Sequence, residues 1–238
     1  MTSRPPSRWQ RLRRKLRDEG PRHTALLILN GLVPRPLIDV RVWVVASTDL
    51  SDFIDAEIPD VGVHWNHGAD GDDAAVEERL AQGKLAAVIE RGDRVVAWEI
   101  FAAGDFVKEN WLRFTFRDKD VYGIAMFVKP EYRGQGLAVG LASFAYRELA
   151  RLGYLRDYGV TDALNLSSLR TSAKARHWPV GRIVYVRCGG FTVIGIDGRF
   201  RAGFWSARNP LVIDFSAFDD KVMQGGETGV SASTVHLE

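Results

Sequence analysis

The sequence has little of several features that would point to a special class of protein. Its 238 residues include one cysteine, Cys188, so an internal disulfide is excluded. No apolar run approaches the roughly 18 residues that a membrane-spanning helix needs, and no signal-peptide pattern opens the chain. No internal repeat is visible, and the formal net charge is only +2. We therefore expect an intracellular, cytoplasmic protein with one main core.

The charge is distributed unevenly between the two ends. Residues 1–22 hold eight Arg or Lys, whereas residues 213–238 hold five acids against one lysine. We predict three parts: a basic amphipathic extension over 1–36, a folded domain over 37–212 and an acidic, disordered tail over 213–238. A solvated arm is the simplest interpretation of the basic start.

The basic extension also suggests partners. An amphipathic basic helix can lie on an anionic membrane surface, which would place the protein at the periphery of the inner membrane surface, or it can meet an acidic carrier protein. Nucleic acid is not expected, because basic and acidic residues are balanced outside the extension and no recognised reader motif is present.

Between residues 37 and 212 the hydrophobic pattern alternates between strand and helix periods, which is typical of an α/β or α+β fold. Apolar residues recur at helical spacing over 137–152, before Gly153. Further helices are expected over 72–82 and 167–176. Strands are expected over 40–46, 85–90, 95–101, 111–116, 122–128, 159–166, 182–187, 191–197 and 200–206.

The most informative stretch is residues 128–138, which read Val-Lys-Pro-Glu-Tyr-Arg-Gly-Gln-Gly-Leu-Ala between a predicted strand and a predicted helix. Because Gly134 and Gly136 have no side chains, the backbone there can approach a ligand closely. Its N–H groups can point at one oxyanion beside a helix N-terminus. The pattern predicts a phosphate-binding loop.

This loop resembles the acetyl-CoA loop of the GCN5-related N-acetyltransferase (GNAT) superfamily, which reads Arg/Gln-x-x-Gly-x-Gly/Ala. Arg133, Gly136 and Ala138 fit that pattern. The resemblance implies a mixed, mostly antiparallel central sheet flanked by helices, with strands splayed at the acyl-CoA site, and acetyl-CoA as acyl donor. It implies that the coenzyme would meet the loop residues Arg133, Gly134, Gln135, Gly136, Leu137 and Ala138 and the strand residues Met126, Phe127 and Val128.

A second segment supports the resemblance. Residues 165–174, Asn-Leu-Ser-Ser-Leu-Arg-Thr-Ser-Ala-Lys, are similar to the family's Asn-x-x-Ser-x-Arg-x-Tyr-x-Lys pattern. The similarity implies that Asn165, Ser168 and Lys174 belong to the coenzyme site. Where many members carry a tyrosine that protonates the departing thiolate, this chain has Ser172, so the family acid is not carried over.

Moving an acyl group from a thioester to an amine needs a base, a donor to the oxyanion and a proton for the thiolate. Glu99 is the first candidate base, because it interrupts an apolar strand, although alternation could simply point it to solvent. Tyr122 and Asp120, at the start of the next strand, are the second choice. The thiolate proton is left open between His177, Ser172, Tyr158 and water. The family geometry places the oxyanion donor at a backbone N–H near Phe127 or Val128.

Other interpretations of these residues fit less well. A dinucleotide-binding loop needs Gly-x-Gly-x-x-Gly, but the glycines fall at 134, 136 and 140, although Asp157 lies near the distance of a ribose contact. His64-Trp-Asn-His67 resembles metal-ligand spacing, yet the segment is loop-like and no metal is expected. Cys188 could be imagined as an acyl carrier, but direct transfer is the better hypothesis.

The sequence therefore predicts an acetyl-CoA-dependent N-acetyltransferase that acts by direct attack of a primary amine, on a small molecule or otherwise exposed, in a ternary complex. One alternative is a longer-chain N-acyltransferase that uses acyl-CoA or acyl carrier protein, suggested by the basic start and the apolar run over 24–33. Another is a catalytically degenerate binding module, suggested by Ser172 and Arg176. The identity of the acceptor and the oligomeric state are not predicted.

Overall fold

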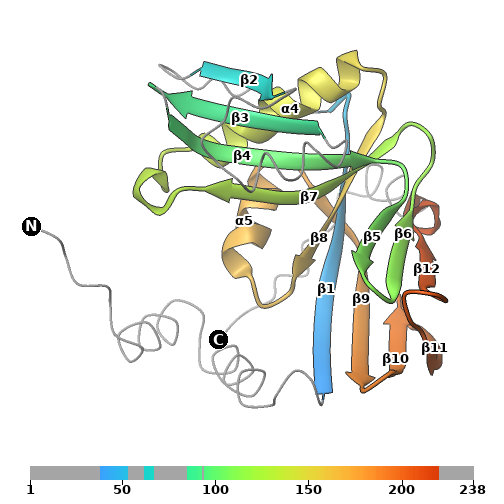
Figure 1. Cartoon of the computed structure of the whole chain (residues 1–238). Helices are drawn as coiled ribbons and strands as arrows, with labels where there is room; N and C mark the ends of the chain where they lie inside the picture. The colour runs from blue at the N-terminus through green and yellow to red at the C-terminus, as the bar shows by residue number, and fades with distance from the viewer. Residues whose placement is uncertain (1–37, 53–61, 67–84, 93, 220–238) are drawn as a thin grey trace, which may run out of the picture.

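The computed structural model describes residues 38–52, 62–66, 85–92 and 94–219. Within them a nine-stranded sheet has the order β11-β10-β9-β1-β8-β7-β4-β3-β2, and a three-stranded sheet has the order β12-β6-β5 (Figure 1). The predicted extension over 1–36, the predicted helix over 72–82 and residues 220–238 of the predicted tail lie outside the described residues.

The elements have the following bounds. The large sheet contains β1 (Ile38–Asp49), β2 (Gly62–Asn66), β3 (Leu85–Arg91), β4 (Arg94–Ala103), β7 (Asp120–Val128), β8 (Arg156–Asp162), β9 (Trp178–Cys188), β10 (Phe191–Ile196) and β11 (Arg199–Phe204). The small sheet contains β5 (Phe106–Glu109), β6 (Leu112–Thr115) and β12 (Leu211–Asp214). The helices are α4 (Leu137–Arg151) and α5 (Leu166–Lys174), with short 3-10 helices η1 (Pro130–Tyr132) and η2 (Phe215–Phe218).

The large sheet is mixed but mostly antiparallel, as predicted. Only β7 and β8 pair in parallel, and α4 forms the crossover between them. All other neighbouring strands in this sheet pair antiparallel. The long strand β1 lies between β8 and β9, so the first described segment of the chain occupies the middle of the sheet.

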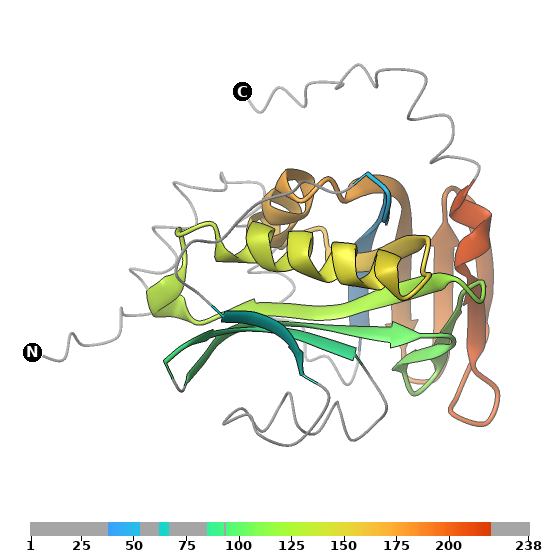
Figure 2. The ribbon, with the colours of Figure 1, turned by 90° about the horizontal axis from the view of Figure 1, so that it is seen from above.

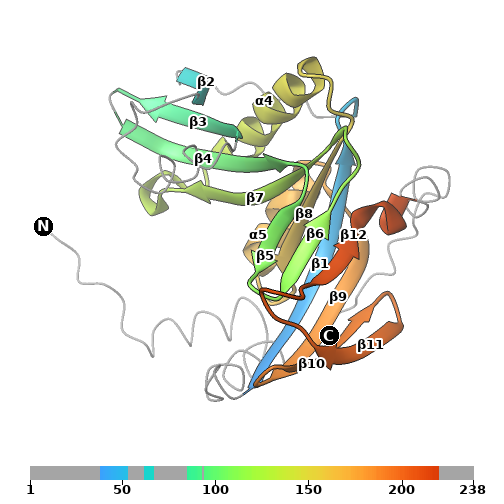
Figure 3. The ribbon, with the colours of Figure 1, turned by 45° about the vertical axis from the view of Figure 1, so that its right-hand side comes forward.

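Side chains pack on both faces of the large sheet. One face meets the small sheet (Figure 3). The contact is made through the aromatic core, which we define as Trp43, Trp111, Phe114, Tyr122, Tyr158, Tyr185, Phe215 and Phe218. The other face is covered by α4 across β3, β4 and β7 (Figure 2). Leu137, Leu141, Ala145 and Leu149 of α4 are buried there at the predicted helical spacing. No helix in the described residues is long and apolar enough to cross a membrane.

Every predicted strand overlaps an observed one, and β3 and β4 form the predicted hairpin through a turn that contains Gly92. The strand predicted over 159–166 is shifted, because the observed strand begins at Arg156 and the chain turns into α5 at Leu166. The short strands β2, β5 and β12 were not predicted, and the expectation that the segment around His64 is loop-like is wrong. These strands are only four or five residues long, which leaves little alternation to recognise.

The predicted start of the disordered tail is wrong. Residues 213–219 belong to the folded domain, because β12 extends to Asp214 and η2 buries Phe215 and Phe218 in the aromatic core. The next residue, Asp219, accepts a hydrogen bond from Arg156 at 2.5 Å. Aromatic burial outweighs the polar composition that favoured disorder.

Candidate functional site

The glycine loop leaves β7 and enters α4 with a defined backbone. After η1, Gly134 and Gly136 have φ values of 81° and 78°, in the left-handed region that favours glycine. The Arg133 side chain folds back, and its Nε donates a hydrogen bond to the carbonyl of Val128 at 3.0 Å. Arg133 therefore holds the loop against the end of the strand.

The loop presents the N-terminus of a fifteen-residue helix. Gly136 is the N-cap of α4, no side chain caps the helix, and its first turn contains no acidic residue. The N–H groups of Leu137 and Ala138 have no intrahelical acceptor, and the helix dipole places partial positive charge there. A Cβ atom at Gly134 or Gly136 would meet nothing within 4 Å, so open space lies in front of these residues. This geometry suits an anionic group such as a pyrophosphate.

Strands β7 and β8 splay as predicted. They pair in parallel from Asp120↔Arg156 to Gly123↔Gly159, and beyond this point β8 remains with β1 while β7 remains with β4 (Figure 1). A register shift in the β4–β7 pairing follows Gly123. The β8-facing edge of Ile124–Val128 therefore has no strand partner in the described sheet, and its backbone groups can pair with an extended ligand.

The three predicted residues on this part of β7 divide between the two faces of the sheet. Met126 and Val128 pack beneath α4. The ring of Phe127 points to the other face, where it stacks on Trp98 at 5.7 Å. The guanidinium of Arg133 lies 5.8 Å from the Phe127 ring centroid. Any contact of Phe127 with a ligand in the splay is therefore made by its backbone.

A buried polar cluster lies beneath α4 where β7 and β8 diverge. We define it as Glu99 of β4, Tyr146 of α4, Asp157 of β8 and His177. Glu99 is 6% exposed, so the interpretation that alternation points it to solvent is wrong. The Asp157 carboxylate is 1% exposed and accepts hydrogen bonds from the Tyr146 hydroxyl and from the backbone N–H groups of Gly123 and Tyr158. Three different elements of the fold thus bring these groups together.

The cluster keeps polar atoms without partners. Glu99 Oε2, Asp157 Oδ1 and His177 Nε2 are buried and accept or donate no hydrogen bond within the described part of the chain. An unsatisfied buried polar atom is costly and needs an explanation. Ser47 Oγ, Asp120 Oδ2 and Arg156 Nε are also without a partner among the described residues, so the position of the cluster beside the splay is what distinguishes it. The cluster is therefore the strongest candidate for the chemistry of this protein.

Burial shifts the pKa values of the cluster so that the neutral form of each side chain is favoured. Burial raises the pKa of Glu99 well above 4.5, and the neighbouring Asp157 carboxylate adds to the effect. Burial likewise raises the pKa of Asp157 well above 3.8, although its three hydrogen bonds oppose the change. The pKa of Tyr146 also lies well above its ordinary value of 10.0, so this hydroxyl stays protonated and donates to Asp157.

His177 belongs to the cluster as a neutral imidazole. Burial lowers its pKa from 6.5 to about 4, which outweighs the backbone carbonyls of Asp157 and Ala46 that favour the cation. Its Nε2 lies 3.7 Å from Asp157 Oδ2, which is too long for a hydrogen bond. The predicted role of His177 as thiolate acid would need the imidazolium, which is scarce near neutral pH in this environment.

The other two tyrosines considered in the sequence lie on the opposite face of the sheet. Tyr122 is buried in the aromatic core, and its hydroxyl accepts a hydrogen bond from Lys108 at 3.2 Å. Tyr158 lies in the same core and donates a hydrogen bond to Asp219. Neither side chain meets Glu99, so the structure does not bring the two candidate bases together.

The predicted coenzyme residues on α5 lie at its two ends. The Asn165 side chain accepts a hydrogen bond from the N–H of Ser168 at 3.2 Å, so these residues form the N-cap. Lys174 is exposed in the last turn. Helix α5 packs against α4, beside the splay (Figure 1). Asn165 thus has a local structural role whatever it contributes to a ligand.

The remaining sequence candidates gain no support. The backbone of His64 lies in β2, while His67 and the aspartates that follow fall outside the described residues. No group of three or more His, Cys, Asp or Glu in the described ranges could hold a metal ion. Cys188 is exposed at the end of β9.

Sequence reasoning missed Tyr146 and Asp157 as members of the site. Tyr146 follows Ala142 and precedes Leu149 at helical spacing, so its burial was predictable, but its partner was not. Asp157 lies two residues before the predicted start of its strand. The only sign in the sequence that Asp157 belongs to a site was its charge close to the start of a predicted strand.

The arrangement combines three functions on one sheet. The loop can bind a phosphate, the free edge of β7 can pair with an extended chain, and the polar cluster at the inner end of the splay can move a proton. An ionised carboxylate at Glu99 can accept a proton from a nucleophile, and its raised pKa makes it a stronger base than an exposed glutamate.

Comparison with known proteins identifies the family. Residues 50–176, more than half of the chain, match the Acetyltransferase (GNAT) family. No curated protein matches at a significant level. Among solved structures, a Drosophila protein shares 15% identity at a TM-score of 0.45, with 70% of this chain and 56% of that chain covered.

Two bacterial acetyltransferase structures are also similar. A GCN5-related N-acetyltransferase from Sphaerobacter thermophilus shares 17% identity at a TM-score of 0.39, with 81% of this chain and 58% of that chain covered. A GNAT-family acetyltransferase from Colwellia psychrerythraea shares 13% identity at a TM-score of 0.41, with 71% and 61% covered. The chain therefore spans 56% to 61% of the length of these three structures. From its glycine loop, its splayed strands and the match over residues 50–176, the chain belongs to the GNAT acetyltransferase family.

Proposed function

We propose that the protein transfers an acyl group, acetyl in the simplest case, from a coenzyme A thioester to a primary amine by direct attack in a ternary complex. The observation that carries this proposal is the placement of the polar cluster. Asp157 contacts Gly123 at the inner end of the β7–β8 splay, Glu99 lies opposite Met126 midway along the free edge of β7, and the N-terminus of α4 follows the outer end of β7. A thioester laid along β7 would end beside the carboxyl groups.

The donor would be held mainly by backbone groups. The N–H groups of Gly134 to Ala138 would receive the pyrophosphate, and the free edge of Ile124–Val128 would pair with the amide groups of the pantetheine arm. Arg133 would hold the loop in place rather than carry the recognition alone, because its Nε already donates to Val128.

Glu99 is the proposed base. In its ionised form it accepts a proton from the amine as the amine nitrogen bonds to the thioester carbonyl carbon. The carbon–sulfur bond then breaks, and the electron pair leaves on sulfur. The captured proton can pass from Glu99 to that thiolate, so the step needs no separate acid. Tyr146 donates a hydrogen bond to Asp157 and so positions its carboxyl group, and His177 stays neutral beside it.

Direct binding tests the donor site without knowledge of the acceptor. Calorimetry should show that acetyl-CoA and free CoA bind the wild-type chain and that Gly136→Trp weakens both at least fiftyfold, because the indole would cover the first-turn N–H groups. Gly153→Trp is the matched control. Gly153 follows the opposite end of α4, also has a positive φ, and has open space around its Cβ position.

The outcomes separate the alternatives. Equal affinity in Gly136→Trp and Gly153→Trp would remove the loop from the site. No binding of CoA to the wild-type chain would contradict the proposed function and favour a degenerate module or a carrier-protein donor. If CoA binds, a screen of primary amines for thiol release identifies the acceptor.

A further inference from the structure

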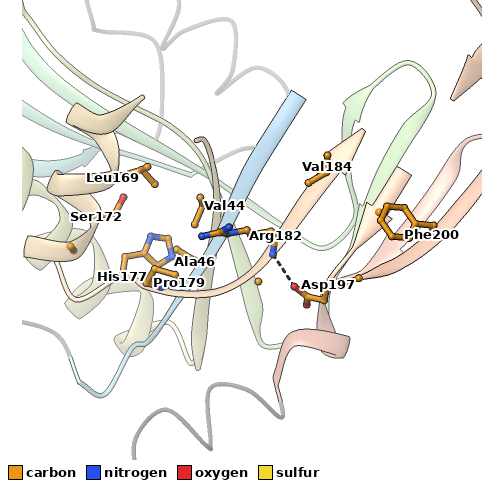
Figure 4. Close-up of a pocket in the computed structure, with 14 residues that line it drawn as sticks. Val44, Ala46, Leu169, Ser172, His177, Pro179, Arg182, Val184, Asp197 and Phe200 are labelled. Atoms are coloured by element: carbon orange, nitrogen blue, oxygen red, sulfur yellow. Dashed lines mark hydrogen bonds between the residues drawn. The ribbon is translucent and has the colours of Figure 1, made fainter. Parts of the chain in front are cut away.

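A cavity of about 640 Å³ lies on the same face of the large sheet as the polar cluster. It is open to solvent on one side and is bounded by α5 and strands β1, β9, β10 and β11 (Figure 4). Its walls are mainly apolar and include Val44, Ala46, Leu169, Ala173, Val184 and Phe200. A volume of this size is typical of a pocket for a small organic ligand.

The inner end of the cavity adjoins the proposed reaction site. His177 lines the cavity, and its ring lies so close to Gly159 that a Cβ atom there would be 2.7 Å from His177 Cε1. Gly159 is the last β8 residue that pairs with β7. Ala46, another wall residue, is the direct partner of Gly159 in the β1–β8 pairing. The cavity thus reaches the His177 ring, which packs on Gly159 where β7 and β8 separate.

Small residues create this space. Ser172 and Ala173 present short side chains from α5, and Ala46 does so from β1. At the outer end, the ring of Phe200 lies over Gly195, where a Cβ atom would be 2.6 Å from the ring. Figure 4 shows Ser172 and His177 at one end and Phe200 at the other. The cavity is therefore elongated away from the reaction site.

The polar groups of the cavity do not favour a cationic ligand. His177 is neutral near pH 7 because of its burial. The Asp197 carboxylate accepts a hydrogen bond from the backbone N–H of Arg182 at 3.0 Å. The guanidinium of Arg182 itself would repel an ammonium group. An uncharged, apolar chain fits these walls better than the amine acceptor does.

We propose that this cavity binds the hydrocarbon chain of an acyl donor longer than acetyl, with its thioester at the divergence of β7 and β8. The inference rests on the proposed function, since it extends the same donor site. An acyl chain starts at the thioester carbon, so it can run directly from the reaction site past Ala46 and His177 toward Phe200. Burial of each methylene multiplies the affinity by up to about four.

Calorimetry with free CoA and with acetyl-, butyryl-, hexanoyl- and octanoyl-CoA tests the proposal without an acceptor. The affinity of the wild-type chain should rise about tenfold for each added pair of methylenes until the cavity is full. Val184→Trp should place an indole in the cavity, so that octanoyl-CoA binds within about threefold of acetyl-CoA. Its affinity for acetyl-CoA should remain unchanged.

Val186→Trp is the matched control. Val184 and Val186 lie on the same face of β9 and are 37% and 43% exposed, but only Val184 lines the cavity. The Val186→Trp variant should keep the wild-type dependence on chain length. Ala173→Phe, an exposed position on α5, fills the same cavity from the other wall and gives a second test if Val184→Trp unfolds.

The possible results distinguish this inference from the proposed function. Binding of free CoA with the same affinity for every acyl chain would overturn the inference and leave the proposed function intact. An equal loss for free CoA and all acyl-CoAs in Val184→Trp would assign the cavity to the coenzyme itself and would also overturn it. No binding of free CoA to the wild-type chain would contradict the proposed function first.

Discussion

The two faces of the sheet at β7 and β8 contrast sharply in chemistry although they are built from neighbouring residues. Tyr122 and Tyr158 point into the aromatic core, whereas Gly123 and Asp157 face α4 and the polar cluster. Alternation of side chains along a strand separates them. One pair of strands thus supplies both a stabilising core and a candidate reactive site.

The comparison shows that burial on one face stabilises the fold, whereas burial of carboxyl groups on the other face costs stability. Aromatic burial stabilises the first face, and the ring of Phe215 packs against Phe114, Phe116 and Tyr158 there. The second face buries Glu99 and Asp157 with unpartnered oxygens, and their raised pKa values report that cost. A fold selected for stability alone would have filled this face with apolar residues.

The largest expected effect comes from Glu99→Gln on the polar face. We expect kcat/KM for acyl transfer to fall by a factor of about 10² to 10⁴, because an amide cannot accept the amine proton. Thiol release with the acceptor found by screening measures the loss. The affinity for CoA and the thermal unfolding midpoint should not decrease, since the substitution removes a buried ionisable group without changing its shape.

Glu109→Gln provides the control for this substitution, because Glu109 is exposed at the end of β5. Its activity should equal that of the wild-type chain. Retention of full activity in Glu99→Gln would exclude Glu99 as the base. The wild-type rate should also rise with pH through the raised pKa of Glu99, and the variant should lose that dependence.

The next largest effect is a loss of stability when a side chain of the aromatic core is truncated. Phe215→Ala should lower the free energy of unfolding by about 3 to 5 kcal/mol, because it opens a cavity among several rings. Urea denaturation measures the change. Phe204→Ala, at a side chain that is 74% exposed, should cost much less. Equal losses would contradict the placement of Phe215 inside the folded domain.

The smallest effect is a pH dependence that separates two members of the polar cluster. His177 has a lowered pKa, so the unfolded chain binds its proton between about pH 4 and 6.5, and the unfolding free energy rises with pH there by up to about 3 kcal/mol. Asp157 has a raised pKa, so the unfolded chain loses its proton first, and the unfolding free energy falls as pH rises above 3.8.

Substitution of each residue in turn separates the two opposite effects of pH on the unfolding free energy. Compared with the wild-type chain, His177→Gln should lose the rising contribution between about pH 4 and 6.5. Asp157→Asn should lose the part of the falling contribution that comes from Asp157, while the part from Glu99 remains. Urea denaturation at several pH values in this window measures both. Identical pH profiles in the two variants would show that the carboxyl and the imidazole do not titrate as their burial requires.

Local patterns made much of the fold predictable. The amphipathic spacing of 137–152 and the short Gly-containing turn before β4 led to α4 and the β3–β4 hairpin at nearly the observed positions. The glycine loop was also predictable, because positive φ values and a helix N-terminus depend on neighbouring residues. Glu99 was identified by the conflict between its charge and its apolar strand.

Non-local pairing could not be predicted in the same way. The position of β1 between β8 and β9 joins residues more than a hundred positions apart. Phe215 and Phe218 were assigned to a disordered tail because their packing partners lie on distant strands. Tyr146 and Asp157 each resemble ordinary helix and strand residues until α4 is laid over the sheet.

The sequence by itself indicated most of the elements, the glycine loop and the family, because these depend on short-range spacing and backbone conformation. Only the tertiary structure decided which face of the sheet carries the buried polar cluster, that Tyr122 and Glu99 lie on opposite faces, and that a cavity opens beside His177. Burial and the loss of solvent around a charged group arise only when distant elements pack together, and they set the chemistry of this site.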